Sequence, residues 1–518
     1  MWTVFKLDHA TIYNYQIYAA SDFEQIALSG HLMTVGTIVS AVLKPPLAQI
    51  SDVIGPAETY IGVIVCYVIS YALCVSARGF GQYIGGYIIN NVGQTGMQIL
   101  NQIIVADITS SRCRGLANGL VSLPFTIIPW FSAFIVDSAL VHIGWRWGIA
   151  MFSIIMLACS LSVVSPLVWF QRRLERAGGC VRTKTSICGF GSQIDFGGML
   201  LLSGGCGMLL LPTALAENAK SRWTTPWVPT LMAIGVAGLT LLIYYESRIA
   251  TKPATPPRLF ENISLPLAFL IRLVDGLCLQ RHTHLPVCLG NSGSRTCVTR
   301  CHVSDDTAGC VQVLIGLGTG FLMYRSKRYK WLLLVGIVIR LIGYGFMMRL
   351  RVIQGAGSGA VGTIVIVVAQ IVVPRAELAY STALELLRIY LGNSAGSAVV
   401  GTIYTNLIKE QLRFWMGLDA SQAAINSIYG SITAVVPRPG TSDRNAINHA
   451  YSDILRSMTI VALVASAIPM VLIWFLSNLE LNDKHNLAGN SPETGESDAQ
   501  PDLADETRPR KWKRRMCW

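Results

Sequence analysis

Long, almost uncharged apolar runs recur along the chain and constrain its fold more than any other feature. Each is close to the ~20 residues that a helix needs to cross a hydrocarbon layer of ~30 Å. The clearest runs are 59–77, 116–137, 143–170, 196–216, 227–245, 331–350, 352–373 and 458–477. Backbone polar groups must pair internally within lipid, so these runs predict transmembrane helices.

The composition excludes an ordinary soluble protein. Of 518 residues, 52% are hydrophobic and 14% are charged, whereas soluble domains carry about 25% charged residues. The mean hydropathy is +0.48. The net charge of +12 does not favour nucleic acid as a partner, because basic residues collect in the cytoplasmic loops of membrane proteins. We predict an all-α membrane protein with about 12–14 transmembrane helices.

The alternation of basic residues between loops predicts an orientation. One set of loops, counted from Lys44 to Arg375, carries sixteen Lys and Arg residues, and the short opposite loops carry six. The basic set is therefore expected in the cytoplasm, with both termini. The segment 406–457 would face outside, either as a ligand-capturing element or as an ordinary loop.

A segment rich in Cys and His, 275–310, interrupts one expected span. Its cysteines and histidines lack the paired C-x2-C spacing of zinc modules. A polar break would leave unpaired backbone in lipid. We interpret the segment as an error in the gene sequence or its reading frame, with metal binding as the lesser alternative. No metal site and no cofactor are predicted.

A stripe of amide side chains is the strongest candidate for a substrate path. Its members recur every four residues, on one face of a single helix: Asn90, Gln94, Gln98 and Gln102. Buried amides need partners or water, so the stripe predicts a hydrated path. The alternative is hydrogen bonding between helices. The aromatic side chains expected to line the outer part of the site are Tyr15, Tyr87 and Trp130.

Three ionisable residues within apolar segments are candidates for proton coupling. Asp8 lies in the first apolar helix, and burial disfavours the charged form of a membrane carboxylate. Glu385 and Arg388 are spaced to pair on one helix face, as a coupling pair or as a neutralised structural pair. No P-loop or catalytic constellation occurs. We therefore expect that the protein is not an enzyme. Transport would be driven by an ion gradient or by the substrate's own gradient.

The segment 44–58 resembles the cytoplasmic signature of the major facilitator superfamily. The residues assigned to this gating motif are Asp52, Gly55, Glu58, Asp107, Arg112 and Arg114. Val53 and Pro56 stand where the superfamily usually has basic residues. The resemblance implies a major-facilitator-type helical bundle.

Several segments together resemble the fungal siderophore-iron transporters within that superfamily. They are 7–15, 44–45, 57–60, 106–116, 122–125, 144–148, 328–331 and 401–406. The resemblance implies fourteen helices and import of a ferric chelate by proton symport. Such chelates are oxygen-rich and often near-neutral, so amides and aromatic rings would suit them better than charged groups. The implied partners are the lipid bilayer, the ferric siderophore and protons, with no obligate protein partner. The implied location is the plasma membrane, or endosomal vesicles.

The expected organisation follows from the runs and the resemblance. It comprises a six-helix half at 1–170 whose first helix is truncated, a cytoplasmic linker at 171–193, two extra helices at 194–246, a second half at 247–477 and a disordered cytoplasmic tail at 478–518. The alternatives are a drug or glutathione exporter of the same superfamily and a non-transporting or degenerate member. The glycine-rich signature of exporters is missing around Pro124 and Pro129, which favours uptake.

Overall fold

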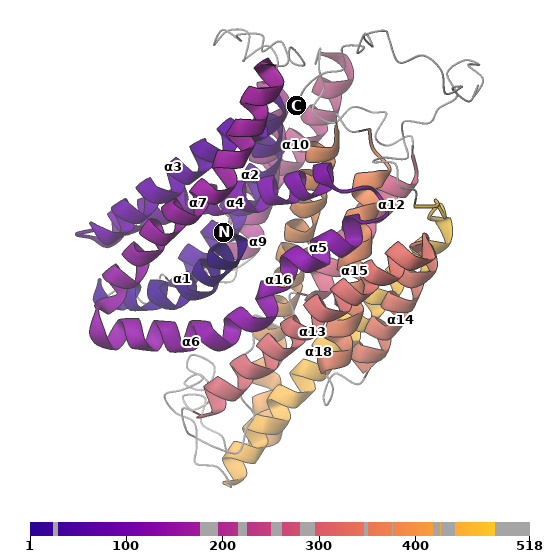
Figure 1. Ribbon diagram of the computed structural model, residues 1–518. Helices are drawn as coiled ribbons and strands as arrows, with labels where there is room; N and C mark the ends of the chain where they lie inside the picture. The colour runs from indigo at the N-terminus through magenta and orange to yellow at the C-terminus, as the bar shows by residue number, and fades with distance from the viewer. Residues whose placement is uncertain are drawn as a thin grey trace.

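The computed structural model describes residues 1–23, 29–176, 195–215, 225–249, 262–279, 296–345, 351–374, 377–417, 425 and 441–481. Every regular element in these ranges is helical, as predicted (Figure 1). The helices are α1 (Trp2–Asp22), α2 (Ser29–Ile54), α3 (Pro56–Val75), α4 (Phe80–Ile108), α5 (Arg114–Ser122), α6 (Pro124–His142), α7 (Gly144–Arg176), α9 (Phe196–Leu215), α10 (Trp227–Arg248), α12 (Ser264–Leu279), α13 (Thr296–Ser326), α14 (Lys330–Gly345), α15 (Arg351–Ile371), α16 (Leu378–Met416) and α18 (Ser442–Leu472), followed by a short 3-10 helix η6 (Ile473–Phe475).

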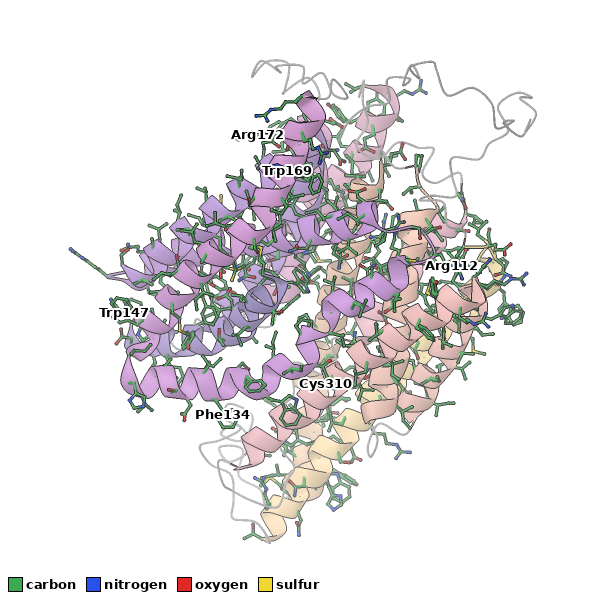
Figure 2. All side chains as sticks on the ribbon, in the orientation of Figure 1. Arg112, Phe134, Trp147, Trp169, Arg172 and Cys310 are labelled. Atoms are coloured by element: carbon green, nitrogen blue, oxygen red, sulfur yellow. The ribbon has the colours of Figure 1, made fainter. Side chains whose placement is uncertain are left out.

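The outer helices carry an apolar surface that the protein itself does not cover. In α7 the most apolar window has a mean hydropathy of 2.2, yet only 17% of it is buried. Trp147 and Trp169 are exposed at opposite ends of α7 (Figure 2), roughly 33 Å apart at the helical rise. That separation matches the ~30 Å hydrocarbon layer, at whose boundaries Trp is enriched. The apolar face of α7 therefore fits lipid.

Six described helices are long and apolar enough to cross a membrane by composition alone, or seven if one bent pair is a single span. The bent pair comprises Arg114–Ser132 and Phe134–His142, and it includes the predicted run 116–137. The long helices α1, α2, α4 and α16 are outside this group, and they supply the polar side chains that line the smaller of two internal cavities. The total of about 12–14 spans stays a prediction.

Two large apolar cores lie on either side of a seam. One joins α1, α3, α4 and α7, and the other joins α12, α14 and α15. Helices α2 and α16 pack together and contribute to both cores. On α16, Ala383 belongs to the first core and its neighbour Leu384 to the second. In Figure 1 the two groups of helices lie to the left and to the right.

Helices α3 and α4 pack closely because glycines remove the side chains between them. A methyl group added at Gly93 would lie 3.1 Å from the Cα of Tyr67, while one added at Gly85 would meet no atom within 4 Å. We expect Gly93→Leu to destabilise the purified protein by about 1–3 kcal/mol, because overpacking forces backbone shifts. Gly85→Leu, on the same helix, is the matched control in a thermal unfolding assay. Equal melting temperatures for the two variants would contradict this packing.

The structure corrects two expectations about loops. Lys44 was counted in a cytoplasmic loop, but it is a buried residue within α2. The two prolines that follow it disfavour a helix locally, yet α2 continues through them to Ile54. The segment 406–457 is not a simple loop either, because α16 extends to Met416 and α18 begins at Ser442.

The extensions of α16 and α18 hold each other through side chains. Trp415 stacks on His449 at 4.5 Å between ring centroids, and its Nε1 donates to Asp453 at 2.9 Å. With 39 residues, α16 is roughly 58 Å long, more than the hydrocarbon layer requires. Tyr429 and Arg438, which belong to the same predicted outer segment, are outside the described residues.

Both ends of the segment 275–310 lie in helices. Helix α12 continues to Leu279, and α13 begins at Thr296. Residues 280–295, with Cys288 among them, are outside the described ranges. An error in the gene sequence therefore stays a prediction.

Candidate functional site

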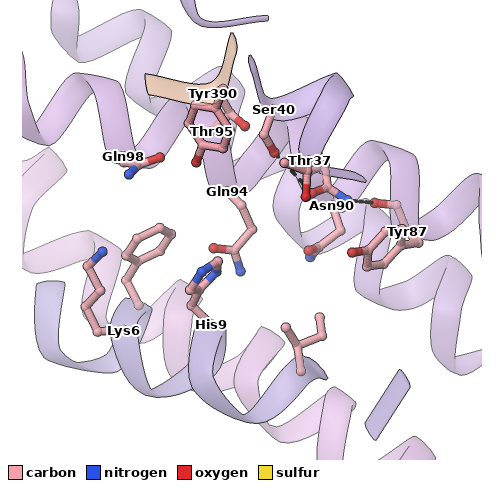
Figure 3. Close-up of a pocket in the computed structure, with 13 residues that line it drawn as sticks. Lys6, His9, Thr37, Ser40, Tyr87, Asn90, Gln94, Thr95, Gln98 and Tyr390 are labelled. Atoms are coloured by element: carbon pink, nitrogen blue, oxygen red, sulfur yellow. Dashed lines mark hydrogen bonds between the residues drawn. The ribbon is translucent and has the colours of Figure 1, made fainter. Parts of the chain in front are cut away.

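All four amides of the predicted stripe line cavities on the inner face of α4, and Figure 3 shows the first three of them. Asn90, Gln94 and Gln98 line a cavity of about 100 Å³ between α1, α2, α4 and α16. Gln98 and Gln102 line a cavity of about 1030 Å³ that also borders α5, α6, α12, α13 and α15. The two cavities share Lys6, His9 and Gln98. The stripe thus passes from one cavity to the other.

The amides differ in what they bond. Asn90 Nδ2 donates to Ser70 Oγ at 3.3 Å, which joins α4 to α3. Gln98 Oε1 accepts from Lys44 Nζ at 3.1 Å. Gln102 Oε1 is buried and has no hydrogen-bond partner among the described residues. The stripe therefore combines the two roles considered from sequence, helix–helix bonding and cavity lining.

Asp8 is a buried carboxylate of the first core that accepts three hydrogen bonds. Its side chain is 1% exposed. It accepts hydrogen bonds from Tyr71 Oη at 2.5 Å, Tyr67 Oη at 2.6 Å and Gln94 Nε2 at 2.6 Å. Donors favour the ionised carboxylate and burial disfavours it. Because Gln94 also lines the smaller cavity, one side chain joins the carboxylate to the cavity.

Basic side chains near the cavities were not predicted as site residues. Lys6 and His9 project from α1 toward Gln98 and Gln94 (Figure 3). Lys6 Nζ lies 4.1 Å from the ring centroid of Phe125, and Lys44 Nζ lies 4.5 Å from that of Tyr390. The sequence could have indicated Lys6, because it is a charged residue inside an apolar segment. It could not indicate Lys44, because the two prolines that follow Lys44 predict a loop there.

The three predicted aromatic residues do not gather in one place. Tyr87 lines the smaller cavity. Tyr15 is fully buried in the first core, where its ring faces Gly148 of α7. Trp130 is 52% exposed on α6. Neither Tyr15 nor Trp130 lines the two cavities described above.

Glu385 has a partner that the sequence did not predict. Arg272 Nε of α12 lies 2.8 Å from Glu385 Oε1, and Arg272 Nη1 lies 2.8 Å from Asp275 Oδ2. Asp275 also pairs with the fully buried Arg340 of α14. Arg388 instead lies over the ring of Phe269, 3.5 Å from its centroid. An ionic network thus joins α12, α14 and α16, and its Arg272 lines the larger cavity.

Three residues of the gating motif, Asp52, Gly55 and Glu58, lie around the start of α3. Gly55 has φ = +111°, which a residue with a Cβ rarely adopts, and Pro56 opens the helix with a preset φ. Glu58 Oε1 accepts from Gln171 Nε2 of α7 at 2.7 Å. Asp52 is exposed at the end of α2, close enough to Asp107 for an electrostatic interaction.

The two arginines of the motif bond to different helices. Arg114 is buried, and its Nη2 donates to the carbonyl of Ala106 at 2.8 Å, at the end of α4. Arg112, labelled in Figure 2, donates from Nε to the carbonyl of Tyr324 at 3.0 Å. Its guanidinium also lies over the Tyr324 ring. Arg112 thus fastens the chain before α5 to α13.

Metal coordination finds no support in the part of the chain that the structure describes. No group of three or more His, Cys, Asp and Glu side chains there is arranged to hold an ion. His282, His284 and Cys288 lie outside those ranges.

Comparisons with known proteins agree with this architecture. The Major Facilitator Superfamily profile matches residues 8–270. The chain is 29% identical to the MFS siderochrome iron transporter C of Aspergillus fumigatus, over 90% of this chain and 80% of that protein. It is 28% identical to the siderophore iron transporter mirC of Emericella nidulans, over 92% and 82%. It is 27% identical to the low affinity heme transporter str3 of Schizosaccharomyces pombe, over 93% and 80%.

A solved structure shows the same fold. The MFS proton:xylose symporter XylE aligns with a TM-score of 0.52 at 12% identity, over 94% of each chain. Identity this low supports a shared fold and nothing about the substrate. The profile covers half of the chain, and the helices surround an internal cavity between two cores. The chain belongs to the major facilitator superfamily.

Proposed function

We propose that this protein is a secondary active transporter of the plasma membrane that imports ferric siderophore chelates by proton symport. The names of its relatives support the substrate class. The observation that carries the coupling is Gln94, which lines the smaller cavity and donates to Asp8. The proposal involves no enzymatic step.

The Gln94 contact suggests how a proton and a chelate would be linked. A ligand oxygen in the cavity competes for Gln94 Nε2, so Asp8 loses one of its three donors. A carboxylate with fewer donors in a buried site takes up a proton more readily. Protonation removes the charge that Tyr67 and Tyr71 hold between α1 and α3. The pairing of α1 with α3 would thereby depend on the bound ligand, as rocking of two helix groups about a central site requires.

Uptake in yeast that lacks its own siderophore transporters tests the proposal. Cells expressing the protein at their surface are given a radiolabelled ferric trihydroxamate, with and without a protonophore. We expect accumulation that the protonophore abolishes. Absence of uptake with protein at the surface would reject import, and efflux of a preloaded compound would then select the exporter alternative.

A single substitution in the stripe tests the cavity. Gln98→Leu removes an amide that lines both cavities and that accepts from Lys44. We expect KM for the chelate to rise about tenfold, since a hydrogen bond involving a charged group contributes about 1.5–3 kcal/mol. Gln82→Leu, at the exposed start of α4, is the control. Uptake kinetics with equal KM for both variants would assign the stripe to packing.

A further inference from the structure

The smaller cavity contains a buried cation that has no anionic partner. Lys6 is 6% exposed, and no hydrogen bond or ion pair to its Nζ occurs among the described residues. No Asp or Glu lines this cavity. The nearest carboxylate in sequence, Asp8, is occupied by Tyr67, Tyr71 and Gln94. A buried charge without a counterion is costly, so an anion in the cavity would stabilise it.

The contacts of Lys6 Nζ are with aromatic rings. Three aromatic rings face Nζ, with centroid distances of 4.1 Å for Phe125, 4.5 Å for Trp2 and 5.3 Å for Phe5. Ring faces attract an ammonium ion. The rings hold the cation in place while they donate nothing to an anion, so the ammonium hydrogens remain available to a ligand.

Gln98 provides a second donor to the same space. Lys44 is a donor only, so the end of the Gln98 amide beside it must be Oε1. Its Nε2 therefore remains as a donor, and no hydrogen bond from it occurs among the residues described. Gln98 and Lys6 line both cavities, and Figure 3 shows them facing the same opening. An ammonium and an amide N–H together suit a carboxylate.

We propose that Lys6 and Gln98 form a subsite for a carboxylate, and that the preferred ligand is an anionic ferric chelate bearing free carboxylates. This inference rests on the proposed function and narrows its substrate class. It departs from the near-neutral chelate that the family resemblance implied. Carboxylates occur both on carboxylated siderophores and on heme, and a relative of this chain is a heme transporter by name. The shared chemistry is an iron chelate whose periphery carries carboxylates.

The test compares two ferric trihydroxamates, one neutral and one bearing peripheral carboxylates, with ferric heme as a third substrate, in the same yeast uptake assay. We expect the carboxylated trihydroxamate to have a KM at least about tenfold lower than the neutral one, in line with a charge-assisted bond. Lys6→Met should raise the KM for the carboxylated chelate about tenfold or more, and it should raise the KM for the neutral chelate much less. Lys6→Arg should bring the KM for the carboxylated chelate most of the way back to that of the unmodified protein. Lys327→Met, at an exposed position, is the control.

A second variant covers the case in which Lys6→Met does not reach the membrane. Gln98→Glu keeps an acceptor for Lys44 but places a negative charge at the subsite, so it should reduce uptake of the carboxylated chelate selectively. Equal KM values in the unmodified protein, or equal effects on both trihydroxamates, would overturn the carboxylate subsite and leave siderophore import intact. Uptake of heme alone would support the subsite but reassign the chelate. Uptake of none of the three would reject the proposed function itself.

Discussion

Asp8→Asn should abolish proton-driven accumulation of the chelate while exchange of chelate across the membrane persists. The asparagine cannot take up and release a proton, and its Nδ2 must face either Tyr71 or the pair of Tyr67 and Gln94, all of which donate to the carboxylate. One coupled proton at a potential of 100 mV is worth about 2.3 kcal/mol. Its loss should therefore lower the accumulation ratio roughly 50-fold. Two measurements in proteoliposomes are compared: accumulation of chelate under an imposed proton gradient, and exchange of chelate by counterflow without a gradient.

The control for this variant lies on the same helix. Asp22 is 52% exposed, and among the described residues its one ion pair is a 3.5 Å contact with Arg146, so Asp22→Asn should accumulate chelate normally. A variant at Asp8 that still concentrates chelate in response to the gradient would move the coupling role elsewhere. Glu385 would then be the next carboxylate to test, because its partner Arg272 lines the larger cavity.

Asp275→Ala should be the most destabilising substitution in the second core. Arg340 is fully buried, and Asp275 is its ionic partner. Two other nitrogens of Arg340 already lack hydrogen-bond partners among the described residues. Breaking a buried pair by removing one partner costs about 3–5 kcal/mol. We expect a large fall in the melting temperature of the purified protein in detergent.

A double substitution separates the charge from the packing. Asp275→Leu combined with Arg340→Met removes both charges and fills similar volume, which is often neutral or stabilising. The double variant should therefore recover most of the stability lost by Asp275→Ala. Asp22→Ala, at the exposed pair with Arg146, should cost no more than about 1 kcal/mol. A loss below that level for Asp275→Ala, or no recovery in the double variant, would contradict an essential role for the buried pair.

Much of the architecture could be predicted from the sequence because it depends on local patterns. Apolar runs longer than a soluble helix needs must face lipid, and the exposed apolar face of α7 agrees with this. The four-residue spacing of Asn90, Gln94, Gln98 and Gln102 fixes them on one helix face, and all four line cavities. Of the eight segments quoted for the family resemblance, the six up to residue 148 overlap the region that the superfamily profile matches.

The partners of the buried polar groups depended on the tertiary structure. The spacing of Glu385 and Arg388 indicated a pair, but Arg272 of another helix reaches Glu385. The sequence around Lys44 indicated a loop, but α2 continues through the prolines and buries the side chain against Gln98. Periodicity determines which residues share a face of one helix. The face that lies opposite is determined by how whole helices pack, and such contacts join residues that are far apart in the chain.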